Sequence, residues 1–328
     1  MNGCTPIALR LLNDYQHGFP LLPRPYAAIG DDLGIGEDEV LALLDRECER
    51  GAVSRIGAVF APRRIGASTL AALAVPADRL DAVAAAVSAR PEVNHNYERE
   101  GDWNLWFVVT AADAAARQRV LDAIARDTGL VPISLPLREA FHIDLGFDLQ
   151  GAAKSVFADD RDAPCALSSV EQRLLAALED GLPLVAQPFA ALGDAAGISE
   201  AMTLEIVGGW LRDGIVKRFG VVVRHQELGY TANAMCVWNL PDDRVAELGR
   251  RLAAAADVTL CYRRERALPH WPYNLYCMIH GNDRETVLAR RAAHAAALGL
   301  DAFPHAELFS LRRFKQCGAR YAQRPAHG

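Results

Sequence analysis

The amino-acid sequence predicts an α+β fold: a tandem repeat in which each copy is a winged helix-turn-helix module followed by a ferredoxin-like βαββαβ domain. Three observations lead to this prediction. The chain of 328 residues repeats itself once, with proline, glycine and apolar positions in register. The first part of each copy has apolar residues at helical spacing. The second part alternates between strand-like and helix-like segments.

The repeat is clearest near the start of each copy. LLNDYQHGFPLLPRPYAAIGDDLGI (11–35) matches LLAALEDGLPLVAQPFAALGDAAGI (174–198), an offset of 163 residues. The same offset relates SRIG (54–57) to KRFG (217–220). We therefore expect the two halves to pack as an intramolecular pseudo-dimer. Whether two complete chains associate into a further homodimer is left open.

The first part of each half reads as short helices and a wing strand. GEDEVLALLDRECERG (36–51) has apolar residues at helical spacing and ends on glycine, as helices often do. SEAMTLEIVGGWLRDG (199–214) is its counterpart. The strands VSRIGAVF (53–60) and IVKRFGVVV (215–223) follow.

The second part of each half has the order βαββαβ, which is typical of the ferredoxin-like sandwich. In the first half the expected elements are strand 67–75, helix 76–89, strands 93–99 and 103–110, helix 111–129 and a last strand around REAFHIDL (138–145). The second half repeats this order from 229 to about 314.

These segments predict five regions along the chain. They are a first helix-turn-helix-like module (1–62), a first ferredoxin-like domain (63–147), a linker (148–167), a second helix-turn-helix-like module (168–225) and a second ferredoxin-like domain (226–328).

Composition excludes several classes of protein. The net charge of −6 gives no overall attraction to nucleic acid or anionic lipid. No segment approaches the roughly 18 apolar residues of a membrane helix, and the N-terminus lacks the pattern of a secretory signal. None of the seven cysteines is paired as C-x-x-C. We expect a cytoplasmic protein with no membrane partner and no protein-bound metal.

The second helix of each helix-turn-helix module argues against DNA binding. A DNA-reading helix carries basic and small polar side chains that face phosphates and base edges. Segment 37–50 instead has six acidic residues against two arginines, and segment 199–214 is also acidic. We expect a packing module and no DNA partner.

Arginines gather at corresponding places in both halves, beside aromatic residues. Arginine presents a planar fork suited to carboxylates. A solvated surface is the alternative explanation, but the pattern favours a flat aromatic ligand with several carboxylates. The arginines are Arg55, Arg63, Arg64, Arg99, Arg218, Arg224, Arg263, Arg264 and Arg266, and the aromatic residues are Trp103, Trp106, Trp271 and Tyr273.

Two histidines are not duplicated by the repeat. His95 falls opposite Leu260 and His225 falls opposite Pro62. Each half therefore supplies one histidine that the other lacks, and both could serve one composite cleft. With pKa values near neutral they would be suitable proton donors. The alternative is that each ring is simply packed.

The architecture resembles that of the Lrp/AsnC transcription regulators. Particular motifs point to one family with this architecture. RRIGA with VNHNYEREGDWNLWF (93–107), and VVVRHQELGY with YRRERALPHWPYNLYCMIHG (262–281), resemble the two halves of siroheme decarboxylases of the haem d1 and alternative haem routes. The resemblance covers both halves, so the chain looks like a fusion of subunits that are separate in other members.

This resemblance implies decarboxylation of two acetate side chains of siroheme to give didecarboxysiroheme, with no cofactor beyond the iron that the substrate carries. His95 and His225 would be the catalytic residues. The implied substrate-binding residues are Arg63, Arg64, Arg99, Arg224, Arg264, Tyr97, Tyr262, Trp103, Trp271, Asn104 and Asn274. Two other hypotheses are kept: a transcription regulator of the Lrp/AsnC type that senses a haem-like ligand, and a non-catalytic tetrapyrrole-binding protein.

Overall fold

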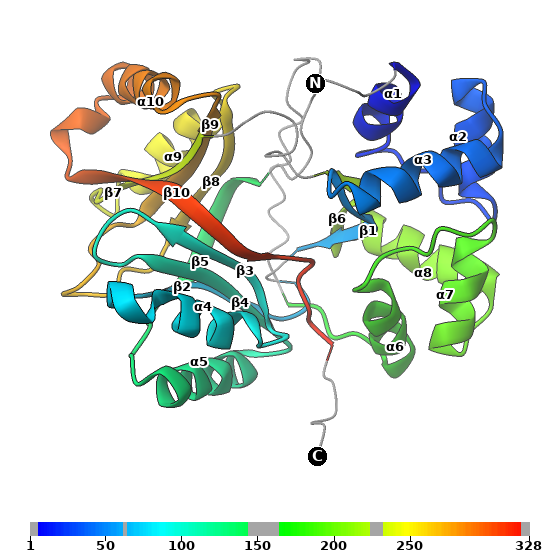
Figure 1. Cartoon of the computed structure of the whole chain (residues 1–328), viewed down its shortest axis with the longest axis horizontal. Helices are drawn as coiled ribbons and strands as arrows, with labels where there is room; N and C mark the ends of the chain where they lie inside the picture. Colours follow the sequence, from blue (N-terminus) through cyan, green and yellow to red (C-terminus); the bar gives the residue numbers. More distant parts are fainter. Residues whose placement is uncertain (1–5, 62–63, 144–163, 224–231, 323–328) are drawn as a thin grey trace.

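The computed structural model describes residues 6–61, 64–143, 164–223 and 232–322. It has two lobes (Figure 1). The helices of both helix-turn-helix modules form one lobe, and a β-barrel with helices on its outside forms the other. Among the described residues, no helix is both long enough and apolar enough to cross a membrane.

The helical lobe contains three helices from each half. The first half contributes α1 (Pro6–Asp14), α2 (Pro25–Leu33) and α3 (Glu37–Glu49), and the second half contributes α6 (Ser169–Leu178), α7 (Pro188–Ala196) and α8 (Glu200–Arg212). Helices α2 and α7 both begin with proline, whose fixed φ suits the first helical position. Both end on a glycine in the left-handed conformation, Gly34 and Gly197.

The wing strands join the two halves. Strands β1 (Val53–Phe60) and β6 (Val216–Val223) form an antiparallel two-stranded sheet in which Gly57 lies opposite Gly220. The motifs SRIG and KRFG therefore meet at the centre of this sheet. Because β1 and β6 come from different halves, neither helix-turn-helix module has a complete wing of its own.

Each wing strand is also bonded to a helical loop of the other half. Leu182 N donates to Ile56 O at 2.6 Å, and Val221 N donates to Tyr15 O at 2.8 Å. A Cβ on Gly220 would lie 2.2 Å from Tyr15 O. The glycine of KRFG is therefore required by the close approach of the loop and the strand.

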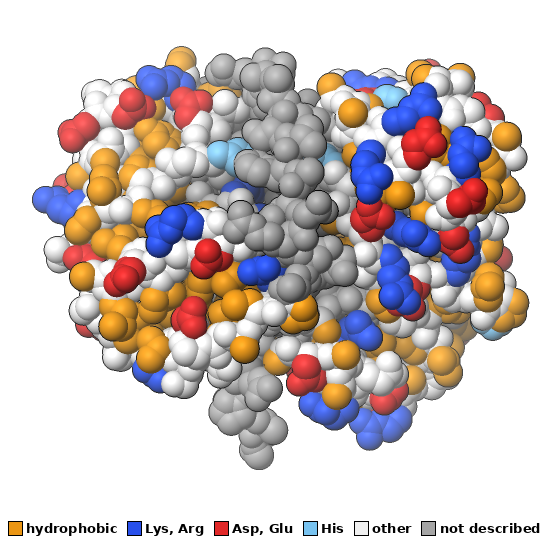
Figure 2. Space-filling model, turned by 180° about the vertical axis from the view of Figure 1, so that it is seen from behind, with side chains coloured by type: hydrophobic (Ala, Val, Ile, Leu, Met, Phe, Trp, Pro, Cys, Tyr) orange, Lys and Arg blue, Asp and Glu red, His pale blue; other side chains and the backbone are white. Residues whose placement is uncertain are grey.

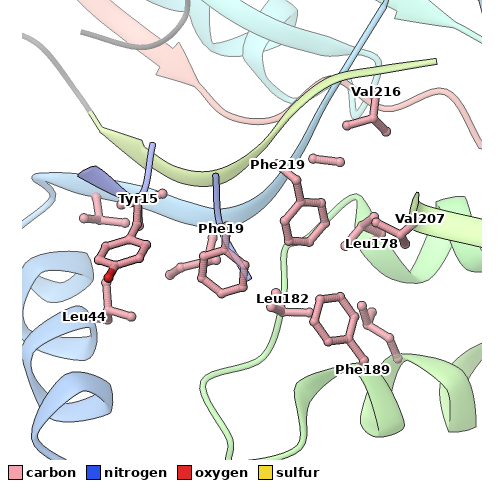
Figure 3. Close-up of a cluster of buried hydrophobic side chains, with 14 of the residues drawn as sticks. Tyr15, Phe19, Leu44, Leu178, Leu182, Phe189, Val207, Val216 and Phe219 are labelled. Atoms are coloured by element: carbon pink, nitrogen blue, oxygen red, sulfur yellow. The ribbon is translucent and has the colours of Figure 1, made fainter. Parts of the chain in front are cut away.

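One hydrophobic core serves both helix-turn-helix modules (Figure 3). Phe19 of the first half packs against Phe219 of the second, with ring centroids 5.7 Å apart. Phe219 in turn packs against Phe189 at 5.9 Å. Burial of such rings removes large apolar surfaces from water. The two modules are thus one packed unit, and their stability is shared.

The other lobe is a closed barrel of eight strands in the order β10-β3-β4-β2-β5-β8-β9-β7. The strands are β2 (Ala67–Leu73), β3 (Val93–Arg99), β4 (Leu105–Ala111), β5 (Ile133–Ile143), β7 (Ala232–Trp238), β8 (Val258–Arg264), β9 (Leu275–Gly281) and β10 (His305–Gln316). The helices outside them are α4 (Leu80–Ser88), α5 (Ala114–Thr128), α9 (Val245–Ala253) and α10 (Arg284–Leu298).

The barrel closes because the last strand of each half pairs with a strand of the other half. Strand β5 pairs with β8, and β10 pairs with β3. The pseudo-dimer that the repeat predicted is therefore present within one chain. The last strand of the first half is longer than expected: it begins at Ile133 instead of near Arg138, because its first residues pair with β2.

The predicted domain boundaries fall partly outside the described residues. This applies to the boundaries at 62–63 and 225–226 and to most of the linker 148–167. Helix α6 begins at Ser169, where Ser168 caps it through a reciprocal bond with Glu171. These boundaries stay predictions.

Candidate active site

A cavity of about 380 Å³ lies between the interior of the barrel and the β1–β6 sheet. This volume is typical of small-molecule sites. Both halves line the cavity, and much of its wall consists of residues at corresponding positions of the two halves. These pairs are Ser68 and Asn233, Leu70 and Met235, Tyr97 and Tyr262, Arg99 and Arg264, and Thr110 and His280. It is therefore one composite cavity.

A β-bulge turns two consecutive residues of β3 into this cavity. Val93 lies opposite Val109 and His95 lies opposite Val108, so the register shifts at Asn94. In a regular strand, Asn94 and His95 would face opposite sides. Both line the cavity because of the bulge. Among the described residues, the buried Oδ1 atom of Asn94 has no hydrogen-bond partner.

In the protein without a ligand, the imidazole of His95 is neutral near pH 7. Its ring stacks nearly parallel to the ring of Tyr97, with centroids 6.3 Å apart. Burial, and then the charge of Arg55, lower the pKa of His95 to about 4. The expectation of a near-neutral pKa is therefore wrong for His95, and near pH 7 this imidazole accepts a proton only when a negative charge approaches it.

Arg99 and Arg264 occupy equivalent positions on β3 and β8. Each guanidinium donates to a backbone carbonyl in the last strand of the other half, at 3.1 Å and 2.9 Å respectively. Their central carbons lie 5.6 Å and 4.5 Å from the ring centroids of Tyr97 and Tyr262. Burial lowers the pKa of Arg99. Both arginines line the cavity, so they present positive charge from opposite sides.

Arg55 adds a third guanidinium to the wall. Its Nη2 donates to Ala58 O at 2.9 Å, while its buried Nε has no hydrogen-bond partner among the described residues. Burial lowers the pKa of Arg55. The sequence indicates Arg55 only as one of the clustered arginines. In the structure, Arg55 lies on β1 and lines the same cavity as His95.

The second half supplies a different polar wall. His280 on β9 and Thr259 on β8 both line the cavity, with His280 Nε2 and Thr259 Oγ1 2.9 Å apart. The register of β8 against β9 shifts at Thr259, as it shifts in β3 at Asn94. Neither residue stands out in the sequence, and the repeat places a threonine, Thr110, opposite His280.

The segment after β10 packs against the helical lobe and forms one side of the cavity. Cys317, Gly318 and Tyr321 are among the lining residues. Tyr321 is buried, and its backbone N–H and that of Ala322 donate to Glu179 Oε1. This segment therefore closes part of the cavity with main chain and a buried ring.

Two predicted binding residues, both asparagines, lie away from the cavity and stabilise loops of the fold. Asn104 bonds in both directions with the backbone of Val75, at 2.9 Å each, and Asn274 bonds in the same way with Leu240, at 2.9 and 3.0 Å. These asparagines hold loops at the far end of the barrel. Nothing in their placement favours substrate binding.

The tryptophans close that far end. Trp271 is buried, donates from Nε1 to Tyr276 Oη at 2.8 Å and packs edge-on against Trp106, with centroids 4.9 Å apart. Trp106 lines the cavity, whereas Trp103 and Trp271 do not. Of the aromatic residues expected beside the arginines, only Trp106 lines the cavity, where Tyr97 and Tyr262 join it.

Comparisons with known proteins agree with this architecture. The protein-family model "Siroheme decarboxylase NirDL-like HTH domain" matches residues 9–53 and 171–216. The family model "AsnC-like ligand binding domain" matches residues 64–142 and 227–315. The chain is 47% identical to the siroheme decarboxylase NirDL subunit of Paracoccus denitrificans (strain Pd 1222), over 96% of this chain and 97% of that protein.

The chain belongs to the NirDL-like siroheme decarboxylase family.

Two further comparisons place it within that family. Its match to the NirD subunit of Stutzerimonas stutzeri is 55% identical and covers 44% of this chain but 94% of that protein. The chain is thus about twice as long as a separate subunit. A crystal structure of the siroheme decarboxylase NirDL in co-complex with an iron-uroporphyrin III analogue superimposes with a TM-score of 0.69 at 27% identity, covering 97% of this chain and 94% of that one.

Not every residue that the family resemblance suggested can be placed. Arg63, Arg224 and His225 lie outside the described residues. Arg64 donates to Asp213 O at 3.3 Å in the helical lobe and does not line the cavity. Of the predicted site, the cavity brings together His95, Tyr97, Arg99, Tyr262 and Arg264.

The helix-turn-helix modules of this family member present acidic second helices. In α3, Glu37 is paired with Arg24, and the buried Glu47 is paired with Arg50. Figure 2 shows positive and negative side chains mixed over both lobes on the face drawn, with no continuous basic band among the described residues. This surface fits a packing role better than contact with phosphates.

Proposed function

We propose that this chain is a siroheme decarboxylase that removes the carboxyl groups of two acetate side chains and yields didecarboxysiroheme. The observation that carries the proposal is the single cavity, in which His95 and arginines of both halves face one space in a member of this family. An anionic macrocycle matches such a wall.

Binding would rest on the arginines and the tyrosines beside them. Arg99 is buried and Arg55 and Arg264 are partly buried, and guanidinium groups shielded from water bind carboxylates more strongly than exposed ones. The tyrosines and Trp106 offer aromatic surface to the ring system. The substrate's charge would offset the cost of burying these cations.

The chemical step breaks the bond between the acetate CH₂ and its carboxylate carbon. CO₂ leaves without the bonding electron pair, which stays on the CH₂ carbon and spreads into the macrocycle. One proton then converts that carbon to methyl. The net change is loss of CO₂ and gain of one proton for each acetate, so no oxidant or reductant is needed.

His95 is the described residue best suited to deliver this proton. Its pKa of about 4 leaves it neutral in the protein alone, but a carboxylate nearby would raise that pKa by favouring the charged form. Binding of the acid side chain would thus load the imidazole with a proton from solution. His225 remains a second candidate on sequence grounds alone.

We propose that the cavity binds a tetrapyrrole. We propose no cofactor beyond the iron that siroheme itself carries. There are two alternative functions. A regulator sensing a haem-like ligand would bind DNA, which the acidic second helices disfavour. A carrier would bind siroheme without releasing CO₂.

The test is anaerobic incubation of the purified chain with siroheme, followed by mass analysis of the tetrapyrrole. The proposal expects loss of two CO₂ units per macrocycle. Siroheme that binds the protein but keeps its mass would favour the carrier, and a shift of genomic DNA fragments in a gel would favour the regulator.

A further inference from the structure

The two walls of the cavity each carry one imidazole, but at positions that do not correspond. His95 is on β3, where the other half has Leu260 on β8; His280 is on β9, where the other half has Thr110 on β4. Part of the wall is matched between the halves, as at Tyr97 and Tyr262 or Arg99 and Arg264. The two histidines, together with Arg55, are among the residues with no matching residue in the wall of the other half, and these residues distinguish one side of the cavity from the other.

The side chain of His280 is held in one orientation by a polar neighbour. Thr259 Oγ1 lies 2.9 Å from its Nε2, which orients the ring. Thr259 reaches this position because the strand bulges there. On the other flank, β7 places the buried Asn233 opposite His280, and Ser310 Oγ holds Asn233 Oδ1 at 2.7 Å.

A tetrapyrrole carries similar acidic side chains around its whole rim. A wall that was fully matched between the halves would accept the macrocycle almost equally well in two orientations related by a half-turn. His95 could then face a side chain that is not the one to react. Specificity requires a difference in affinity between these orientations, which only unmatched residues can supply.

We propose that His280, oriented by Thr259, is a substrate-positioning residue that binds an acetate carboxylate of the macrocycle on the wall opposite His95. It thereby fixes which side chain His95 faces. This inference rests on the proposed function and names a further binding group for the same site. With Nε2 beside Thr259 Oγ1, the neutral ring can donate to a carboxylate from Nδ1 when the proton is on that nitrogen, and it attracts the carboxylate more strongly once both nitrogens are protonated.

The test compares two iron porphyrins by absorbance titration: iron-uroporphyrin III, which carries acetates, and iron-coproporphyrin III, which carries methyl groups in their place. We expect His280→Phe to weaken binding of the first about 10-fold or more, as loss of a bond to a charged group does, and to leave the second nearly unchanged. His280→Gln should retain part of the affinity. The matched control is His294→Gln, since His294 pairs with Asp257 on the outside of the same half.

Turnover gives the second readout. With siroheme, His280→Phe should raise KM more than it lowers kcat, and Thr259→Val should show a smaller effect of the same kind. Equal loss of affinity for both porphyrins, unchanged affinity for both, or a fall in kcat at constant KM and affinity would each overturn the positioning role. If wild-type protein binds iron-uroporphyrin III but never decarboxylates siroheme, the proposed function fails while the binding role of His280 can still be judged.

Discussion

At the scale of single residues, it was predictable from the sequence that strand 93–99 contributes to the cavity wall, whereas the local geometry of the strand was not predictable. The order His-Asn-Tyr-Glu-Arg places alternate residues on one face, so His95, Tyr97 and Arg99 were expected to act together, and they line one cavity. Asn94 joins them only because of a bulge, which depends on pairing with β4. His280 has no sequence signal of its own.

The low pKa of His95 predicts that the free energy of unfolding depends on pH. Its folded pKa of about 4 lies below the ordinary value of 6.5. As the pH falls through about 6.5 the unfolded chain takes up a proton that the folded chain does not, so stability is lost between about pH 6.5 and pH 4. Relative to wild type, His95→Gln should therefore gain about 1–3 kcal/mol over that window. Denaturant unfolding of both proteins at several pH values would measure it, and parallel curves would contradict it.

At the scale of elements, helical and strand periodicity was sufficient to predict nearly every helix and strand. What periodicity could not predict is the partner of each edge strand. The closure of the barrel depends on β5 meeting β8 and β10 meeting β3, and these contacts join distant parts of the chain. The extra length of β5 follows from the same pairing, because a strand continues where it has a neighbour.

The glycine of KRFG offers a test of how the halves interlock. Gly220→Ala would place a methyl group 2.2 Å from Tyr15 O, so we expect a loss of about 1–3 kcal/mol in unfolding free energy. Gly209→Ala is the matched control, since its Cβ meets only Arg212 Nη2 at 3.8 Å within α8. It should gain about 0.5–1 kcal/mol. Equal stability of the two variants would argue against the close contact.

At the scale of the whole molecule, the repeat predicted a pseudo-dimer but not which structural units would combine residues of both halves. The wing sheet, the helical core and the barrel each combine both halves. One consequence is a composite cavity that both halves line. Association of two complete chains stays a prediction, because the contacts within one chain do not decide it.

A single composite cavity predicts the stoichiometry of binding. Titration of the chain with iron-uroporphyrin III should saturate at one macrocycle per chain, because the two halves form one binding space. The chain concentration would be fixed independently by amino-acid analysis. Saturation at two macrocycles per chain would show that each half has its own site.

The most direct test of the whole account is anaerobic turnover of siroheme in D₂O by the wild type and by His95→Ala, with mass analysis of the product. We predict that the wild type yields a product that has lost two CO₂ units and carries one deuterium in each new methyl group. His95→Ala should stay folded and be slower by about 100-fold or more, as expected for loss of a general acid. A folded His95→Ala protein with wild-type turnover, or methyl groups without solvent deuterium, would contradict the account.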